Sequence, residues 1–509
     1  MITLKDLEHE LLVAINILRN SPKSINYTSY LSKLSKFLLL KRLSDRFEEE
    51  AQAIRRETGE RNLAWNKPEG HQFFIPEGSR WDDLLKLSRN TSEAFNKAVE
   101  FIENANPRLE KIFVGTDWDD RELLDLIFHF SKFNLKNSNL PEPDVPGKAC
   151  KFLIEKLAES AGYKGEVFPT PSSLGELLVR LLEPQQGLSI CDQTCGSGGI
   201  LVEWANQIKQ QGGDQNSDPN KVLLYGQEVN LESWAIAKIN LLLNNLYNFD
   251  IRLGDTLRDP QLVEGNKLML FDRIIASPPF NVMWGDEIGK IDKYNRFPYG
   301  IPPKNSGDFA FIQHILATLN DTGKAAVVVP PGVLFRGGGV VVRPGVLFRR
   351  GTEGEIREKL ITADLIEAVI GLPPNLLYGT GIPIVILIFN RKKPEKHKGK
   401  ILFIDASREY QKGKGRNYLG EQDIAQIVSV YQAFQDLVSL EDQKGYAKVV
   451  SFEELTNNDY NLNIHRYMET PKLEVDIPAE ITKLRELEAE RAEAESEMNE
   501  CLRALGVKL

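Results

Sequence analysis

The chain has 509 residues, of which 42% are hydrophobic and 27% are charged, and its formal net charge is −9. This length predicts two or three domains, and the composition is that of a soluble globular protein with no apolar run long enough to span a membrane. The acidic balance disfavours a protein that coats nucleic acid by charge alone, so a DNA substrate would need a basic partner or a local basic surface. Four cysteines without a Cys-x-x-Cys pair indicate neither a metal site nor disulfides, and the N-terminus lacks the features of a signal peptide. We therefore expect a cytoplasmic protein with no metal.

The first part of the chain, to about residue 165, carries apolar residues at helical spacing. The clearest segments are 4–18, 27–57 and 147–162, and the stretches between them are rich in Pro and Gly. This pattern predicts a separate helical N-terminal domain, to which we assign residues 1–145.

The middle of the chain alternates short apolar runs with helical segments. The strand candidates are 188–191, 222–228, 251–255, 271–277, 324–330, 365–373, 383–390 and 401–407. This alternation predicts an α/β fold, a Rossmann-like and mostly parallel sheet with helices on both faces, over residues 146–415. Ligands of such sheets bind at the carboxyl ends of the strands, so the polar residues that follow each run are candidate site residues.

Two further segments complete the organisation of the chain. Residues 416–509 are predicted to be mostly helical, ending in a long amphipathic helix that packs either on a partner helix or on its own domain. Residues 327–338 are nearly repeated at 340–351, and only one copy can occupy a given strand position. We expect the other copy to form a loop at the margin of the sheet, without an assigned function.

A glycine-rich turn follows the first strand candidate. Asp192 ends the strand, and Gly196, Gly198 and Gly199 precede a helix, where backbone N–H groups can approach a ligand. Leu201 replaces the third glycine of a dinucleotide fingerprint, and the Gly-Lys-Ser/Thr of a phosphate loop is absent. The turn resembles motif I of S-adenosylmethionine-dependent methyltransferases; the alternative is an ordinary strand-to-helix turn.

Acidic residues also end the second and third strand candidates. Glu228 could accept hydrogen bonds from the cofactor's ribose, and Asp255 could accept one from the exocyclic amine of its adenine. Helix capping is the alternative role for either acid. Upstream, Phe168, Thr170 and Pro171 precede a helix whose N-terminus could bind the methionine carboxylate, although Thr-Pro commonly marks a simple helix start.

The fourth strand candidate ends in Ser277-Pro278-Pro279-Phe280. This matches the [Asn/Asp/Ser]-Pro-Pro-[aromatic] motif of enzymes that methylate exocyclic amines of DNA bases. Ser277 and a proline carbonyl can accept the two amine protons and so direct the nitrogen lone pair at the methyl donor. Phe280 offers a stacking face for a base that has left the duplex. A Pro-Pro stop after a buried strand is the structural alternative.

Together these motifs resemble the modification (DNA methyltransferase) subunit of type I restriction-modification systems. Further segments that are similar to this family include 37–51, 371–390, 401–419 and 458–467. The resemblance implies methylation of adenine N6 in double-stranded DNA with S-adenosylmethionine as cofactor. It also implies a complex of two such subunits with one specificity subunit, which a restriction (translocase) subunit can join.

The resemblance also implies particular cofactor contacts. They fall on Phe168, Pro169, Thr170, Pro171, Ser172, Ser197, Gly198, Gly199 and Glu228, beside the candidates Asp192, Gly196 and Asp255. The family usually has Asn at position 277, Pro at 193, no residue equivalent to Pro169 and one copy of the 327–338 segment. Ser-Pro-Pro-[aromatic] is more typical of N4-cytosine enzymes, so that activity remains an alternative. A second alternative is a subunit that binds the cofactor but does not transfer methyl groups.

Two expectations concern DNA. About 100 residues follow the last strand candidate and contain no large recognition domain, which indicates that the target sequence is chosen by the specificity subunit. The basic run 391–400 is expected to be a solvated loop between two strands rather than a DNA contact. Tyr378 is a candidate for the second stacking face around the target base.

Overall fold

The protein is described by a computed structural model over residues 1–20, 27–113, 115–161, 169–211, 221–280, 282–285, 287–335, 351–436, 445–468 and 477–504. Phe168 and nearly all of the second copy of the duplicated segment lie outside these residues. Two compact units are present, Met1–Met468 and Glu469–Leu509. Among the described residues no helix is both long and apolar enough to cross a membrane.

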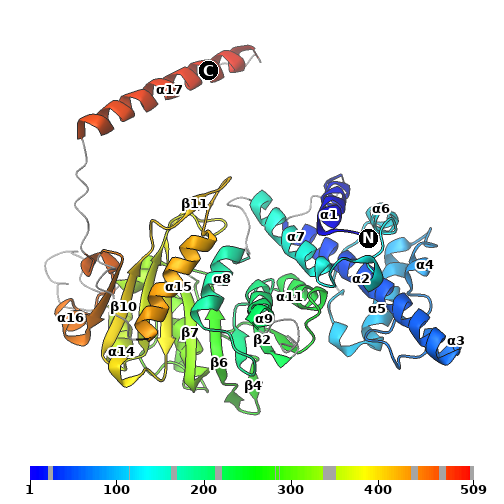
Figure 1. Cartoon of the computed structure of the whole chain (residues 1–509), viewed down its shortest axis with the longest axis horizontal. Coiled ribbons are helices and arrows are strands. Elements are labelled where there is room, and N and C mark those ends of the chain that lie inside the picture. Colours follow the sequence, from blue (N-terminus) through cyan, green and yellow to red (C-terminus); the bar gives the residue numbers. More distant parts are fainter. Residues whose placement is uncertain are drawn as a thin grey trace. The chain divides into compact units, whose positions relative to one another are not determined.

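The N-terminal part is helical, as the sequence predicts, and occupies one side of the first unit (Figure 1). Phe37 on the long central helix stacks against Phe95 and meets Trp118 and Phe130, so aromatic packing forms much of this core. Thr3 and Asp119 cap the first and sixth helices with their side-chain oxygens. The helices are α1 (Leu4–Arg19), α2 (Tyr27–Thr58), α3 (Arg61–Asn66), α4 (Trp81–Leu84), α5 (Thr91–Ala105), α6 (Asp120–Phe130) and α7 (Val145–Ala161).

A nine-stranded sheet forms the centre of the first unit, with the order β13-β10-β8-β9-β7-β6-β1-β2-β3. Seven strands run in one direction, and β9 and β13 are antiparallel to their neighbours. The predicted mostly parallel α/β sheet is therefore confirmed. The strands are β1 (Ser189–Asp192), β2 (Leu223–Glu228), β3 (Phe249–Leu253), β6 (Phe271–Ala276), β7 (Leu319–Val329), β8 (Ile366–Leu372), β9 (Ile384–Asn390), β10 (Lys400–Asp405) and β13 (Ala447–Ser451).

Both faces of the sheet are covered by helices. Ile190 points into one core and Cys191 into the other, as the two-residue period of a strand requires. The first core lies under α8 (Ser172–Leu181), α9 (Gly199–Gln211) and α15 (Glu421–Gln435). The second lies under α13 (Asp308–Ala317), α14 (Thr352–Thr362) and the short α16 (Phe452–Asn457). Smaller elements are α12 (Glu287–Lys290) and the hairpins β4 (Val263–Glu264) with β5 (Lys267–Leu268) and β11 (Gln411–Lys412) with β12 (Asn417–Tyr418).

One helix joins the helical part to the sheet. On α11 (Leu231–Leu243), Ile236 and Ile239 belong to the helical core, whereas Ala237 and Leu241 belong to the sheet core. This helix therefore has almost no solvent-facing side, which explains its nearly uniform apolar sequence. The predicted domain limits at residues 145 and 415 stay predictions.

The C-terminal region contributes a strand to the central sheet that the sequence pattern did not indicate. β13 pairs with β10 at the edge of the sheet, and its exposed residues interrupt the apolar run on which strand prediction depends. In the second unit, α17 (Ile477–Ala504) exposes Ile481, Leu484 and Leu487. A long helix at the end of the chain agrees with the sequence prediction.

Candidate functional site

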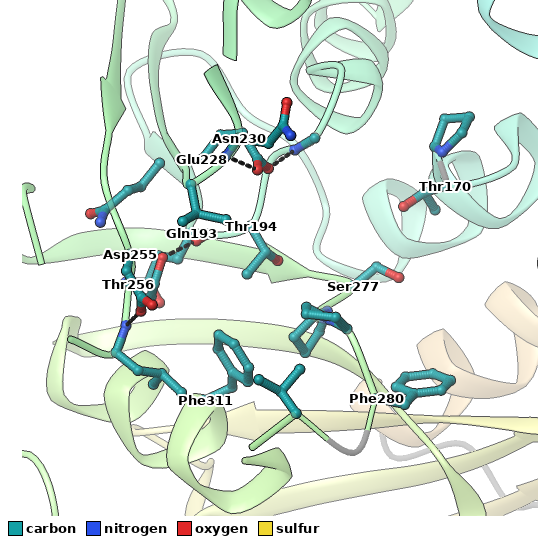
Figure 2. Close-up of a pocket in the computed structure, with 18 of the residues that line it drawn as sticks. Thr170, Gln193, Thr194, Glu228, Asn230, Asp255, Thr256, Ser277, Phe280 and Phe311 are labelled. Atoms are coloured by element: carbon teal, nitrogen blue, oxygen red, sulfur yellow. Dashed lines mark hydrogen bonds between the residues drawn. The ribbon is translucent and has the colours of Figure 1, made fainter. Parts of the chain in front are cut away.

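A pocket of about 540 Å³ lies where the carboxyl ends of the central strands meet (Figure 2). Because these strands are parallel, their ends converge on one edge of the sheet, as the sequence analysis expected. Predicted residues that line the pocket are Pro169, Thr170, Gly196, Glu228, Asp255, Ser277, Pro278, Pro279, Phe280 and Tyr378.

Other predicted cofactor residues lie beside this pocket rather than on its wall. Ser172, Ser197 and Gly199 line a neighbouring pocket of about 460 Å³, which shares Pro169 and Thr170 with the first. Pro171 is the N-cap residue of α8 and lines neither pocket. Asp192 is buried and lines neither pocket. Phe168 lies outside the described residues.

The turn between β1 and α9 requires glycine for two reasons. Gly196 and Gly198 have φ of +51° and +73°, in the left-handed region that side chains disfavour. A Cβ on Gly198 would also lie 3.3 Å from the Cα and Cβ of Ala237 on α11. The turn is held from the same helix by Asn240, whose Nδ2 donates to the Ser197 carbonyl at 3.0 Å.

Glu228 at the end of β2 is fixed by backbone N–H groups. Its two carboxylate oxygens accept hydrogen bonds from Gly196 N at 3.0 Å and Asn230 N at 2.8 Å, and Figure 2 shows both. Burial raises the pKa of Glu228, and these hydrogen bonds oppose that shift. Each carboxylate oxygen keeps a second lone-pair position, so Glu228 can still accept a bond from a ligand hydroxyl.

Two other acids follow neighbouring strands and have different environments. Burial, with a further contribution from the charge of Glu228, raises the pKa of Asp192 to about 7. Asp255 accepts from Leu257 N and Arg258 N, both at 2.9 Å, and pairs with the Arg258 guanidinium at 2.9 Å. Asp255 therefore does cap the turn after β3, the alternative role raised from sequence, while it also lines the pocket.

The Ser-Pro-Pro-Phe segment begins at the residue after β6. Ser277 and Phe280 are half-buried, and Pro278 is buried. The Ser277 hydroxyl makes no hydrogen bond within the described part of the chain and lines the pocket. Figure 2 shows Phe280 on the opposite side of the pocket from Glu228. A hydroxyl that no described residue occupies, beside an aromatic ring, is the arrangement needed to hold a planar amine.

The other aromatic candidate is fixed by a cation. Tyr378 lines the pocket and is 8% exposed. Its hydroxyl accepts from Arg416 Nη2 at 3.0 Å, and the Arg416 guanidinium lies 4.4 Å from the ring centroid. Burial raises the pKa of Tyr378, so the phenol remains neutral.

Sequence reasoning missed several residues of the pocket wall. Thr194, Asn230, Thr256, Trp284 and Phe311 all line it. Asn230 could have been found because it follows Glu228 by two residues. Phe311 gave no signal, because it lies within the apolar sequence of α13 and reaches the pocket only through the packing of that helix.

A buried arginine supports the wall after β3. Arg296 donates to the carbonyls of Thr256 at 3.2 Å and Leu257 at 2.9 Å, and pairs with Asp292 at 2.7 Å. His314 Nδ1 lies 3.2 Å from the same guanidinium, and burial with this charge holds the pKa of His314 well below its usual range. A neutral imidazole can therefore accept from Arg296. Nothing in the sequence pattern indicates this network.

This fold is that of S-adenosylmethionine-dependent methyltransferases. Two family models match the chain: N-6 DNA Methylase over residues 141–339 and 338–476, and HsdM N-terminal domain over residues 7–133. The chain belongs to the N-6 DNA methylase family and has the domain organisation of type I restriction enzyme methylase subunits.

Comparison with individual proteins also shows similarity to type I methylase subunits. The MjaVII methylase subunit of Methanocaldococcus jannaschii is 32% identical over 82% of this chain and 70% of its own length. The HindI methylase subunit of Haemophilus influenzae is 32% identical over 85% of this chain and 95% of its own length. The crystal structure of a type I restriction-modification methyltransferase subunit from Streptococcus thermophilus superposes with a TM-score of 0.75 at 26% identity, covering 92% of this chain and all of that one.

The family predicted from the motifs is therefore confirmed, and with it an adenine-specific DNA methyltransferase activity. The match to an N-6 DNA methylase model favours adenine N6 over the cytosine N4 alternative that Ser277 left open.

Proposed function

We propose that this chain binds S-adenosylmethionine in the pocket at the strand ends and methylates N6 of an adenine that has left the DNA duplex. A separate specificity subunit chooses the sequence, two copies of the chain join each specificity subunit, and a restriction subunit can join the complex. The complex acts in the cytoplasm, on double-stranded DNA. The observation that carries the proposal is the Ser277 hydroxyl, which has no hydrogen-bond partner among the described residues and lies on the wall of the pocket that Glu228 also lines.

The residues around the pocket suit this cofactor. Glu228 would accept from the ribose hydroxyls, because its orientation is set by Gly196 N and Asn230 N. Thr170 and the N-terminus of α8 would hold the methionine carboxylate, since helix N-termini favour anions. Asp255 would accept from the exocyclic amine of the cofactor's adenine. The pocket volume of about 540 Å³ is typical of pockets that bind ligands of this size.

Asp192 would act through charge rather than contact. The cofactor carries a net positive charge when its amine is protonated, and a buried carboxylate nearby favours a cation. Asp192 also accepts from Thr194 N at 3.0 Å and so helps to shape the turn that Gly196 begins.

S-adenosylmethionine supplies, when bound, an electrophilic methyl group on a sulfonium. Ser277 and the Pro278 carbonyl would accept the two protons of the adenine N6 amine, which directs its lone pair at that methyl group. Phe280 and Tyr378 would hold the two faces of the base. The proton lost from N6 passes to solvent, because Ser277 is an acceptor and not a base.

The test replaces Ser277 with Ala in the complex with the cognate specificity subunit. Loss of an acceptor that acts on the reacting amine, worth ~1.5–3 kcal/mol, should lower kcat roughly 10- to 100-fold. The Kd for S-adenosylmethionine should stay within about twofold, because this hydroxyl does not hold the cofactor. Ser429→Ala is the matched control, since Ser429 is exposed on α15 and does not line the pocket. Equal losses of kcat and cofactor affinity in Ser277→Ala would contradict the assigned role.

A further inference from the structure

A basic hairpin stands beside the pocket. The hairpin arm, residues 407–418, contains β11 and β12, which pair through Gln411 with Tyr418 and Lys412 with Asn417. Within it are four basic residues and one acid: Arg408, Lys412, Lys414, Arg416 and Glu409. The arm is thus locally positive in a chain whose net charge is −9.

The arm is attached to the pocket wall by direct bonds. Arg416 donates to the Tyr378 hydroxyl and covers its ring. Asn417 N donates to Asn375 O at 2.8 Å, and Asn417 Nδ2 donates to Pro374 O at 2.9 Å. These partners belong to the loop after β8, whose residues 377–380 line the pocket. The base of the arm therefore lies at the pocket, and Figure 1 shows the arm projecting beyond the end of the sheet.

Three cations of the arm are available to a partner. Arg408, Lys412 and Lys414 are exposed, and none pairs with a carboxylate anywhere in the described ranges. Other exposed lysines do find acids, such as Lys398 with Glu395 and Lys448 with Glu454. Uncompensated cations on a projecting hairpin form a surface that attracts a polyanion.

The other basic run cannot serve the pocket. Residues 391–400 follow β9, which is antiparallel to β7. This run therefore lies at the amino ends of the parallel strands, opposite to the carboxyl ends where the pocket lies. Within it Lys393 is buried and bonded to Asp364 at 2.6 Å, and His397 is buried against Phe434. The run is a loop between two strands, as predicted, although parts of it are packed rather than solvated.

We propose that the hairpin arm binds phosphates of the DNA strand beside the target adenine, with Lys412 and Lys414 as the principal contacts. This inference rests on the proposed function, because it assumes that the pocket receives a base from DNA. The arm supplies the local basic surface that an acidic chain needs in order to approach DNA. Lysine contacts to phosphate carry no sequence information, so they position the strand while another subunit selects the site.

The test compares two double variants in the complex with the specificity subunit. Lys412→Gln/Lys414→Gln removes two charges from the arm, and Lys392→Gln/Lys396→Gln removes two exposed charges from the opposite edge. Affinity for a duplex with the recognition site is measured by fluorescence anisotropy over a series of salt concentrations. Each phosphate contact contributes about 0.9 to the slope of log K against log salt. The arm variant should reduce the magnitude of this negative slope by about two for every copy of the chain that contacts DNA. The control should leave the slope unchanged.

Kinetics separate this inference from the proposed function. In the arm variant KM for DNA should rise about tenfold or more, while kcat at saturating DNA and the Kd for S-adenosylmethionine stay unchanged. Equal slopes for the arm variant, the control and the wild type would overturn the inference and leave methylation intact. Loss of complex assembly in the arm variant, seen by size-exclusion chromatography, would overturn it too and assign the arm to a protein partner. Absence of methylation by the wild-type complex would instead reject the proposed function itself.

Discussion

The buried carboxylate of Asp192 makes the unfolding free energy depend on pH. Its pKa rises from an ordinary value of 3.8 to about 7, chiefly because burial penalises the charged form. An acid with a raised folded pKa binds more protons in the folded state, so stability is lost as pH rises from about 4 to about 7 and is constant above that. Replacing Asp192 with Asn removes this loss and keeps an oxygen that can accept from Thr194 N.

The expected size follows from the two pKa values. One pKa unit corresponds to about 1.4 kcal/mol, so the ionisation of Asp192 destabilises the cofactor-free protein by about 4 kcal/mol at pH 8. At pH 5 the same relation gives a destabilisation of only about 1.5–2 kcal/mol, because Asp192 of the folded protein is then nearly all protonated. The advantage of Asp192→Asn over the wild type should therefore grow by about 2–3 kcal/mol between pH 5 and pH 8.

Urea unfolding followed by tryptophan fluorescence, without cofactor, measures this difference. Asp272→Asn is a control of opposite sign: burial opposes the shift, but hydrogen bonds from Ser189 and Asn320 hold the pKa of Asp272 below its ordinary value. That variant should lose more stability at pH 8 than at low pH, because its stabilising charge is lost as pH falls. If Asp192→Asn were destabilising by the same amount at both pH values, Asp192 would not be an ionisable buried acid of the kind described.

Two other substitutions test the geometry of the pocket. Gly198→Ala should weaken S-adenosylmethionine binding at least tenfold in calorimetric titration and lower thermal stability, because Cβ meets Ala237 at 3.3 Å and φ is +73°. Gly381→Ala, with open space for Cβ and no positive φ, is its control and should cost far less. Tyr378→Phe should keep the stacking face and leave kcat/KM for DNA within about threefold, whereas Tyr378→Ala should lower it roughly 5- to 100-fold, the value of ~1–3 kcal/mol for one stacked base. Equal effects of the Phe and Ala variants would remove Tyr378 from base recognition.

Much of the site could be predicted from sequence because parallel strands place their ends together. Glu228, Asp255 and Ser277 each follow an apolar run, and that position alone brings them to one edge of the sheet. Gly198 could be expected to be glycine, but its second reason, contact with Ala237, depends on where α11 packs.

Other features could not be read from the sequence. Phe311 lines the pocket through the packing of α13, and Arg416 contacts the pocket residue Tyr378 through the anchoring of the hairpin arm, each from an element distant in the chain. The buried bonds of Arg296 are likewise set by tertiary structure, since an arginine in a polar stretch normally indicates a surface. β13 escaped prediction because an edge strand needs only one buried row.

We propose that this chain, together with a specificity subunit, methylates adenine at N6 through the pocket at Ser277. The direct measurement is mass spectrometry of nucleosides from DNA that the co-purified complex has methylated with labelled S-adenosylmethionine. We expect labelled N6-methyladenine with the wild type, and a rate that falls roughly 10- to 100-fold in Ser277→Ala. Labelled N4-methylcytosine without N6-methyladenine would contradict it, and so would an undiminished rate in the Ser277 variant.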